Sequence, residues 1–540
     1  MTMVDVNEKG DSADLPTSAD GPQFSQIPAE LLRIVFVFAA MGVRDRGRGA
    51  PPCAKLSHVN KRWRDIALTT QELWSTVPRK SSEWTSICLL RAPSALLDVI
   101  LTNDHLQDEG YRTAAVKALS AWPRIRSVRA TLARYLTPEG PLVDRSKSMF
   151  DALLGTLGAP NATLEQLHLN FTIDSGITGR WTPINLSNDL FGGQHPLHLS
   201  DIELSNCALP RPPPPSLFGS GLRSLRLFNT QAWVDIDSMV KCLRAVPMLE
   251  KLVYRFSRSP AEGFDFEPSS VHQPRCIPLR HLKTMSLGGF WVQNMAIFSY
   301  IAAPSQCHLE VLHCEWDDFV DEMPEEAALE LISGCAATMK QHFMPATSQG
   351  VAFSSVIPFE FAVWAESNPA DPAEASLLPH KLELALPQTG KPSIKRAVFD
   401  MVVSQPVVTN TESLFFTADL WKLHPECFDL YINVREIILN GYDDAEALVT
   451  ALRTRGATIF PVLAFIVLRR FYVEDLGLDL LRELVAELRT DHAASRSFER
   501  LVMDDCHYVT QEIVDELRGE LGAERVEWEK RDDWGEGQSP

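Results

Sequence analysis

A Leu-x-x-Leu-x-Leu pattern recurs along this 540-residue chain and constrains its fold more than any other feature of the sequence. Apolar residues at these three positions suit a short strand and its lead-in, with all three side chains on one side of a coil. A single coil of this kind cannot enclose its own core, so neighbouring coils must stack. The copies that we assign begin at Leu164, Leu199, Leu222, Leu249, Leu282, Leu309, Val434, Leu463 and Phe498.

The copies begin at irregular intervals. Successive starts lie 35, 23, 27, 33 and 27 residues apart in the first group, and 29 and 35 residues apart in the last. Their pattern resembles an irregular leucine-rich-repeat array, in which a parallel sheet forms one side of a solenoid and helices line the other. We therefore expect an α/β fold over residues 77–529 with every triplet pointing into the core, the sixth triplet being Leu309, Leu312 and Cys314.

Two copies carry a cysteine three residues after their third apolar position. Cys207 follows Leu204 in this way, and Cys506 follows Met503. In leucine-rich repeats, an asparagine or cysteine at this place satisfies backbone groups in the turn after the strand. The segment after Cys506 resembles the strand-to-helix segment of cysteine-containing repeats, and Thr510 is expected to cap its helix.

The region before the first triplet predicts βα units. Residues 85–90 and 125–129 resemble strands, while residues 108–121 and 147–157 have the pattern of helices. Strands that alternate with helices are typical of a parallel α/β arrangement.

Between residues 318 and 432 the triplets disappear. Strand-like runs remain at 359–364 and 381–386, so we interpret this region as degenerate coils or an insertion. The two ends of the chain, 1–24 and 530–540, are polar, and we expect a disordered N-terminal tail and a flexible C-terminal tail.

A second feature lies before the repeats, at residues 25–76. Pro28 suits the first turn of a helix, and apolar residues follow at 31, 32, 35, 36 and 39 with helical spacing. Ile34, Val37 and Phe38 lie outside that stripe, so the helix has more apolar surface than one small core can cover. A partner surface is therefore implied. A second amphipathic helix is predicted around Trp63, with basic residues on its opposite face.

These residues also resemble a known motif. Residues 27–74, and only these, are similar to an F-box. The similarity lies in Ile-Pro-Ala-Glu-Leu-Leu at 27–32, Val-Phe at 35–36, Ser-His-Val-Asn-Lys-Arg-Trp at 57–63 and Leu-Trp at 73–74. The resemblance implies a helical domain that docks on a Skp-type adaptor, which links it to a cullin–RING ubiquitin ligase. The adaptor-binding positions would be Ile27, Pro28, Leu31, Leu32, Val35, Phe36, Val59 and Trp63. A helical hairpin that caps the following domain is the alternative for this stretch.

Composition restricts the possible partners and the compartment. The net charge of −19 argues against binding of nucleic acid by most of the chain. Residues 44–64 nevertheless hold seven Arg or Lys, which form either a solvated face or a patch that steers an acidic partner. The apolar runs at 34–43 and 459–468 are too short to cross a membrane. Ten cysteines without a Cys-x-x-Cys pair suit reduced thiols, so we expect a cytoplasmic or nuclear protein.

Motifs for enzyme chemistry are missing from the sequence. It contains no phosphate loop, no Gly-x-Ser-x-Gly elbow, no His-Glu-x-x-His and no dinucleotide fingerprint. Cys307, His308, His313 and Cys314 contain metal-binding residue types, but the predicted strand between them would point their side chains to opposite faces. We therefore expect neither an enzyme nor a metal or cofactor.

The sequence thus favours a substrate-recognition subunit of an SCF-type ubiquitin ligase, with the F-box-like segment on the adaptor and the repeat array on a protein cargo. The alternative is a leucine-rich-repeat scaffold that binds proteins without any ligase. Polar residues between and after the inward leucines would face out along the strands, because strand side chains alternate between faces. The candidate cargo-binding residues are Arg226, His313, Arg469, Arg470, Asp504 and Asp505.

Overall fold

The chain divides into two compact units in the computed structural model, which describes all residues except 1–26, 43–51, 104–107, 136–141, 175–182, 257–263, 314–322, 344–349, 355–359, 365–379, 386–390, 424, 470, 472–474, 490–496, 505 and 529–540. The first unit comprises residues 1–100 and 105–124, and the second comprises 101–104 and 125–540. The domain boundary predicted at residues 76 and 77 therefore falls inside the first unit.

The first unit is mainly helical. Its elements are α1 (Ala29–Gly42), α2 (Pro52–Leu56), α3 (Lys61–Thr69), η2 (Gln71–Trp74), β1 (Thr76–Val77), α4 (Ser82–Arg91), most of β2 (Leu97–Thr102), α5 (Glu109–Leu119) and η4 (Trp122–Arg124). The backbone carbonyl of Pro28 accepts the first helical hydrogen bond of α1, so the helix begins one residue after the proline. The strand predicted at 85–90 was wrong, because these residues lie in α4, where the Ser81 hydroxyl caps the helix.

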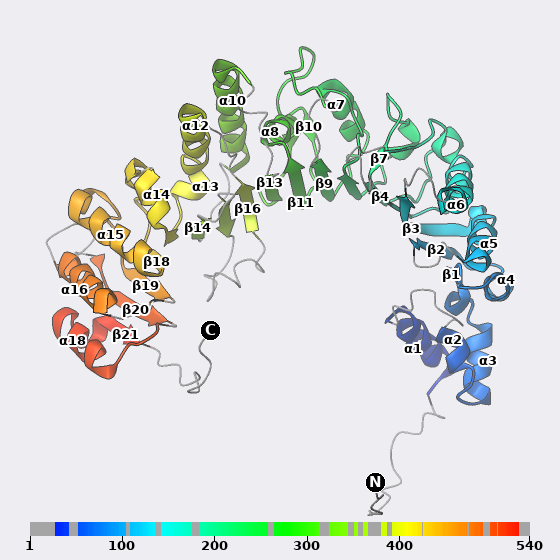
Figure 1. The fold of residues 1–540 in the computed structure, drawn as a ribbon, viewed down its shortest axis with the longest axis horizontal. Coiled ribbons are helices and arrows are strands. Elements are labelled where there is room, and N and C mark those ends of the chain that lie inside the picture. Colours follow the sequence, from blue (N-terminus) through cyan, green and yellow to red (C-terminus); the bar gives the residue numbers. More distant parts are fainter. Residues whose placement is uncertain are drawn as a thin grey trace, which may run out of the picture. The chain divides into compact units, whose positions relative to one another are not determined.

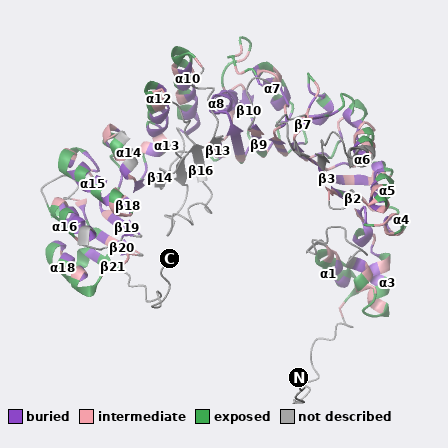
Figure 2. Ribbon diagram, in the orientation of Figure 1, coloured by how far each residue is buried: buried purple, intermediate pink, exposed green. Residues whose placement is uncertain are grey.

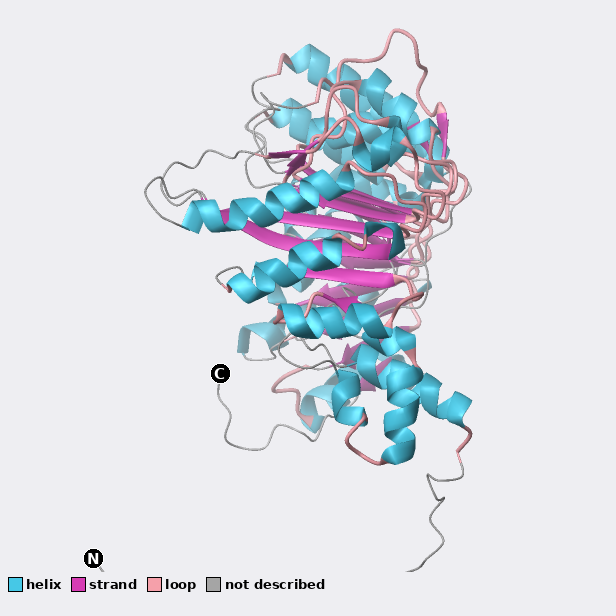
Figure 3. Cartoon of the chain, turned by 90° about the vertical axis from the view of Figure 1, so that its right-hand side faces the viewer, coloured by secondary structure: helices cyan, strands magenta, loops and turns pink. Residues whose placement is uncertain are grey.

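The second unit contains one large sheet of mostly parallel strands, with helices along one side of it (Figures 1 and 3). Two small parallel sheets accompany it, one of β5 (Ile184–Asn185) and β7 (Cys207–Ala208) and one of β10 (Ile277–Pro278) and β12 (Ile301–Ala302). Each strand pairs with the next one in the following spatial order: β3 (Ile125–Tyr135), β4 (Gln166–Asp174), β6 (Asp201–Ser205), β8 (Ser224–Phe228), β9 (Lys251–Phe256), β11 (Thr284–Gly289), β13 (His308–His313), β16 (His380–Ala385), β15 (Glu360–Trp364), β14 (Gly350–Ser354), β17 (Ser413–Phe416), β18 (Glu436–Asn440), β19 (Phe465–Arg469), β20 (Arg500–Asp504) and β21 (Val526–Trp528). This arrangement confirms the α/β class and the large parallel sheet.

The predicted triplets form the core of this unit. Leu222, Leu225 and Leu227 are fully buried, and all the other triplets except the sixth are also buried (Figure 2). The register explains why they stack, since Leu225 pairs with Ile202 on one side and with Leu252 on the other. Each fully buried leucine stabilises the fold by roughly 1.5–3 kcal/mol, which is why the pattern is so regular at these positions.

The sixth triplet was assigned to the wrong register. Leu309 pairs with Met285, which is the second member of its own triplet, and Val311 then takes the third position. Leu309 and Val311 are both 1% exposed. The backbone of Leu312 pairs with Gly288, so the assigned triplet is out of register by one residue from Leu312 onward.

A three-stranded insertion explains the loss of pattern between 318 and 432. β13 is followed in the chain by β14, but its neighbour in the sheet is β16. β15 runs antiparallel between β16 and β14, and β14 then pairs in parallel with β17. The insertion therefore reverses the spatial order of these strands without breaking the sheet.

The helices of the second unit pack on one side of the sheet, and their apolar faces match the helical period. Helix α7 (Ile236–Arg244) buries Ile236, Met239, Val240 and Leu243, and Asp235 caps it through the backbone N–H of Ser238. The other helices are α6 (Leu142–Leu157), α8 (Trp291–Tyr300), α10 (Glu325–Phe343), α12 (Pro392–Val403), α13 (Pro406–Thr409), α14 (Ala418–Leu423), α15 (Tyr442–Arg455), α16 (Asp475–Arg489) and α18 (Gln511–Leu521).

Side-chain donors satisfy backbone carbonyls in the turns after two of the strands. The Cys506 thiol donates a hydrogen bond to the carbonyl of Leu468 on the preceding strand, at 3.4 Å. The Thr230 hydroxyl, at the equivalent place in another coil, donates to the carbonyl of Leu204 at 3.0 Å. Thr510 caps α18 as predicted, through the N–H of Ile513. None of the described helices is long and apolar enough to cross a bilayer.

Candidate interaction surfaces

The first candidate surface is an apolar stripe on α1. Leu31, Ile34, Val35 and Phe38 are between 51% and 69% exposed, and they recur at positions i, i+3, i+4 and i+7 of the helix. Residues with this spacing lie on one face, so the four side chains form a continuous strip, which we call the α1 stripe. Helix α1 is largely exposed in Figure 2. An exposed apolar strip of this kind is a candidate surface for binding another molecule.

The opposite face of α1 anchors the helix in its unit. Leu32 and Phe36 are 2% and 1% exposed, and the Phe36 ring packs on the Trp63 ring with their centroids 4.7 Å apart. The Trp63 backbone N–H bonds to the Asn60 side chain, which caps α3. Trp74 closes the group by donating its indole N–H to the carbonyl of Ala67 at 2.8 Å. These contacts fix which face of α1 points outward.

The predicted adaptor-binding residues thus divide into two groups. Pro28, Leu31, Val35 and Val59 are exposed and accessible to a partner, Val59 being 57% exposed. Ile27 and Trp63 are half-buried. Leu32 and Phe36 belong to the core of the unit, so they support α1 and offer no contact surface.

Several basic residues of this region are exposed. Lys61 and Arg64 are exposed on α3, whereas the Arg62 guanidinium donates a hydrogen bond to the carbonyl of Ile27. Arg33 is exposed on α1, on the side of the helix that faces away from the α1 stripe by helical spacing.

The second candidate surface is the strand face, which consists of the strand side chains that alternate with the buried triplets and point away from the helices. On β3 to β13 they are mostly polar. Its central row crosses the strands in register and contains Arg129, His168, Glu203, Arg226, Val253, Ser286 and Glu310. The neighbouring row, one pleat earlier in each strand, contains Ser127, Gln166, Asp201, Ser224, Lys251, Thr284 and His308.

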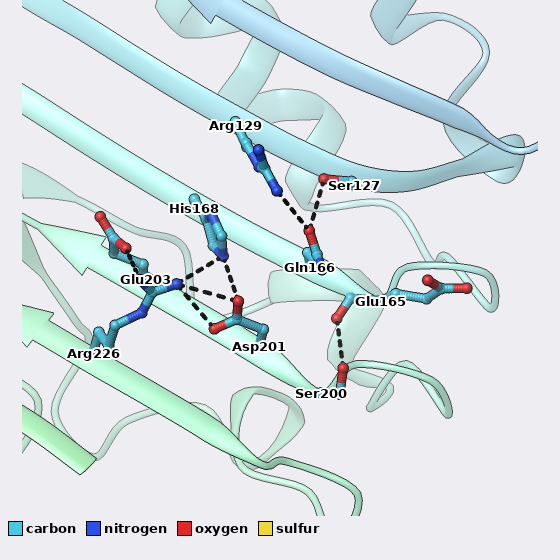
Figure 4. Close-up of polar contacts among 9 residues, drawn as sticks. All are labelled: Ser127, Arg129, Glu165, Gln166, His168, Ser200, Asp201, Glu203 and Arg226. Atoms are coloured by element: carbon cyan, nitrogen blue, oxygen red, sulfur yellow. Dashed lines mark hydrogen bonds and ion pairs between the residues drawn. The ribbon is translucent and has the colours of Figure 1, made fainter. Parts of the chain in front are cut away.

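Four residues of the strand face form a charged cluster, which we call the Asp201 cluster (Figure 4). The Arg226 guanidinium lies 2.8 Å from a Glu203 carboxylate oxygen and 3.2 Å from both oxygens of Asp201. The His168 ring Nε2 lies 2.8 Å from Asp201 Oδ2. Cross-strand pairs of opposite charge stabilise a sheet, so the cluster holds β4, β6 and β8 in register.

The electrostatics of the Asp201 cluster keep Asp201 ionised. Burial by itself raises the pKa of Asp201, but hydrogen bonds from His168 and Ser224 and the charge of Arg226 outweigh it and lower the pKa to about 2. The Ser224 hydroxyl bonds to Asp201 and thus does not serve as a nucleophile beside His168. In a Ser–His–Asp arrangement the histidine must stand between the serine and the carboxylate, so this geometry does not support acyl transfer.

A second charged cluster lies further along the strand face. The Arg255 guanidinium donates to the Ser286 hydroxyl and to the Glu310 carboxylate, the latter at 3.1 Å. Its side chain passes over Gly288, where a Cβ atom would lie 2.9 Å from Arg255 Cγ. The glycine therefore allows an arginine on β9 to span β11 and reach β13.

The strand face changes character in the C-terminal strands. Phe415, Ile438 and Val467 occupy one row of β17, β18 and β19, and their exposures are 5%, 0% and 6%. Val502 continues the row on β20. This part of the strand face is apolar and largely shielded, unlike the polar face of β3 to β13.

The structure places the predicted cargo-binding residues in different surroundings. Arg226 points outward but is already paired in the Asp201 cluster. Arg469 is only 7% exposed and lies 3.4 Å from Asp504. Arg470 and Asp505 lie outside the described residues, as does the side chain of His313, whose backbone pairs with Gly289.

Two of the buried thiols have strongly raised pKa values. Burial raises the pKa of the Cys53 and Cys307 thiols to about 12, so both are protonated at neutral pH. No group of three or more His, Cys, Asp or Glu side chains is placed there to hold a metal ion.

No protein-family model matches this sequence, and no curated protein matches it.

Proposed function

We propose that this protein is a substrate-recognition subunit of an SCF-type cullin–RING ubiquitin ligase, whose first unit docks on a Skp-type adaptor and whose second unit binds a protein cargo. The observation that carries the proposal is the α1 stripe, in which Leu31, Ile34, Val35 and Phe38 are all at least half exposed on one helix face. This helix lies in the segment that resembles an F-box.

Energetics favour a protein partner for the α1 stripe. Burying one such side chain fully stabilises a complex by about 1.5–3 kcal/mol before the entropy of association is subtracted. The core contacts of Leu32 and Phe36 hold α1 in place, so the partner does not have to order it first.

The second unit supports the cargo-binding half of the proposal. Its strands form a continuous sheet, and the strand face of β3 to β13 is mostly polar, with Arg129 and Lys251 exposed on it. A solenoid of leucine-rich repeats would use this side of the sheet for recognition. The helix side would need only a polar, solvated surface.

The experiment is co-purification with a Skp-type adaptor. Replacing Leu31 and Val35 by Asp places two charges in the proposed contact, where each costs several kcal/mol when buried, so we expect adaptor capture to be lost. Both side chains are more than half exposed in the free protein, and folding should persist. Phe36 is unsuitable for this test, because it packs on Trp63 in the core of the unit.

Leu90→Asp is the matched control. Leu90 is 79% exposed on α4 of the same unit but lies outside the α1 stripe, so the same apolar-to-acid change there should leave adaptor capture intact. Capture that persists at the wild-type level in the Leu31/Val35 variant would refute adaptor docking through α1. The alternative of a repeat scaffold without ligase association would then be preferred.

A further inference from the structure

The charge pairing of the strand face leaves two cations unpaired. Arg129 on β3 and Lys251 on β9 are exposed, and neither has a carboxylate partner within the described part of the chain. Other cations of this face and its edge are neutralised: Arg226 by Asp201 and Glu203, Arg255 by Glu310, and Arg223 and Lys283 by Glu250.

Arg129 is held in position without losing its charge. Its guanidinium donates a hydrogen bond to the Gln166 side-chain carbonyl at 3.2 Å, and the Ser127 hydroxyl lies 3.4 Å from the same oxygen (Figure 4). A neutral acceptor orients the guanidinium, yet its positive charge remains available to a ligand. An arginine fixed in this way loses less side-chain entropy when it binds a carboxylate.

The sheet fixes the distance between the two cations. β4, β6 and β8 lie between β3 and β9, so four strand spacings separate Arg129 from Lys251, or roughly 19 Å. Lys251 belongs to the neighbouring row, which adds roughly 7 Å along the strands. The backbone positions are therefore about 20 Å apart, which an extended peptide spans in roughly six residues.

We propose that the strand face of β3 to β9 binds an extended peptide segment that carries two acidic side chains about six residues apart, one on Arg129 and one on Lys251. Residues i and i+6 of an extended chain point to the same side, so both carboxylates reach the sheet together. The inference rests on the proposed function and names the chemistry of the cargo that the second unit recognises.

The Asp201 cluster explains why the acidic groups must be separated. Asp201 and Glu203 lie between the two free cations and are paired with Arg226, so a continuous run of negative charge would be repelled there. A nucleic acid carries such a run along its backbone, and the net charge of −19 opposes it further. Uncharged residues between two carboxylates fit the cluster without repulsion.

The test uses the full-length chain and fluorescein-labelled heptapeptides in anisotropy titrations at low ionic strength. The first peptide carries Glu at positions 1 and 7 with alternating Thr and Ser between them; a second carries Glu at 1 and 3, and a third carries Lys at 1 and 7. We expect the first peptide to bind most tightly, and added salt to weaken its binding.

Substitutions assign the binding to the two cations. Arg129→Ala and Lys251→Ala should each weaken binding of the first peptide by up to about five-fold, the upper end of the range for an exposed ion pair. The double variant should bind the first and second peptides equally. Arg129→Lys keeps the charge and should retain most of the affinity. Arg223→Ala is the control, because Arg223 is an exposed arginine of the same sheet that is already paired with Glu250.

Two results would overturn the inference: equal binding of the peptides with wide and narrow spacing, or an unchanged affinity in the double variant. Adaptor capture is measured on the same preparations. If the wild-type chain captures no adaptor but prefers the widely spaced acidic peptide, the ligase proposal fails and the acidic-peptide surface stands. If it captures the adaptor and shows no such preference, only the inference about the strand face fails.

Discussion

Gly289 provides the sharpest test of how the strands of the second unit end. It has φ = 117°, a conformation that residues with a side chain rarely adopt, and a Cβ atom added there would lie 1.9 Å from the backbone carbonyl oxygen of Phe256 on β9. A strained backbone costs about 1–3 kcal/mol, and relieving the overlap requires a backbone shift of similar cost. We expect Gly289→Ala to destabilise the second unit by about 4 kcal/mol.

Two other glycines separate the contributions. Gly441 has φ = 115° but no atom within 4 Å of its added Cβ, so Gly441→Ala should cost only the backbone strain. Gly334 lies in α10 without a positive φ and also has open space around it, so Gly334→Ala should stabilise the helix by about 0.5–1 kcal/mol. The three variants share one chemical change and differ only in their surroundings.

The assay is urea denaturation followed by circular dichroism, with hydrogen exchange of the β9 and β11 amides as a local measure. Exchange is needed because a unit of this length does not have to unfold in a single step. Faster exchange in β9 and β11 for Gly289→Ala alone would support the reasoning. If Gly289→Ala is no more destabilising than Gly441→Ala, the close approach of β11 to Phe256 is incorrect.

Two further perturbations test the second unit. Burial of the His342 ring, helped by the charge of Arg275, lowers its pKa from 6.5 to about 4. The ring therefore contributes stability above pH 6.5 that is lost as the pH falls from 6.5 towards 4, about 3 kcal/mol in all. His342→Leu should reduce the pH dependence of the urea denaturation midpoint over this range, and an unchanged pH dependence would contradict this role of His342. Leu225→Ala should lower the free energy of unfolding in urea by about 2–5 kcal/mol, because Leu225 is fully buried. The same change at Leu197, which is 78% exposed, should have little effect. Similar denaturation midpoints for the two variants would mean that the triplet does not form the core.

The sequence identified the core of the second unit because its apolar triplets alternate with polar residues on each strand. Leu225 and Leu227 are buried, while Arg226 between them points outward, as alternation requires. The register of a strand could not be predicted where the pattern has leucine at both possible positions. Leu309 and Leu312 each fit the pattern, and only the pairing of β13 with β11 decides between the two registers.

The candidate site on α1 was only partly predictable, for a different reason. Helix α1 is apolar nearly all round, so helical spacing fits two stripes equally well. The contact between Phe36 and Trp63 decides which stripe is the core, and it joins two helices that are separate in the sequence. The charge pairs of the strand face could not be predicted from the sequence either, because Asp201 and Arg226 come together only when β6 and β8 pair in register.

The reversed strand order between β13 and β17 has a consequence for synthesis on the ribosome. β13 ends at His313, but its partner β16 begins only at His380, after α10, β14 and β15 have emerged. The growing chain therefore exposes an unpaired parallel edge at β13 while more than sixty further residues are made, and such an edge invites pairing with other chains. Coils before the insertion can close in the order in which they are translated, but the later coils must wait for β14 to be placed. We therefore expect folding of the nascent chain to pause at this insertion.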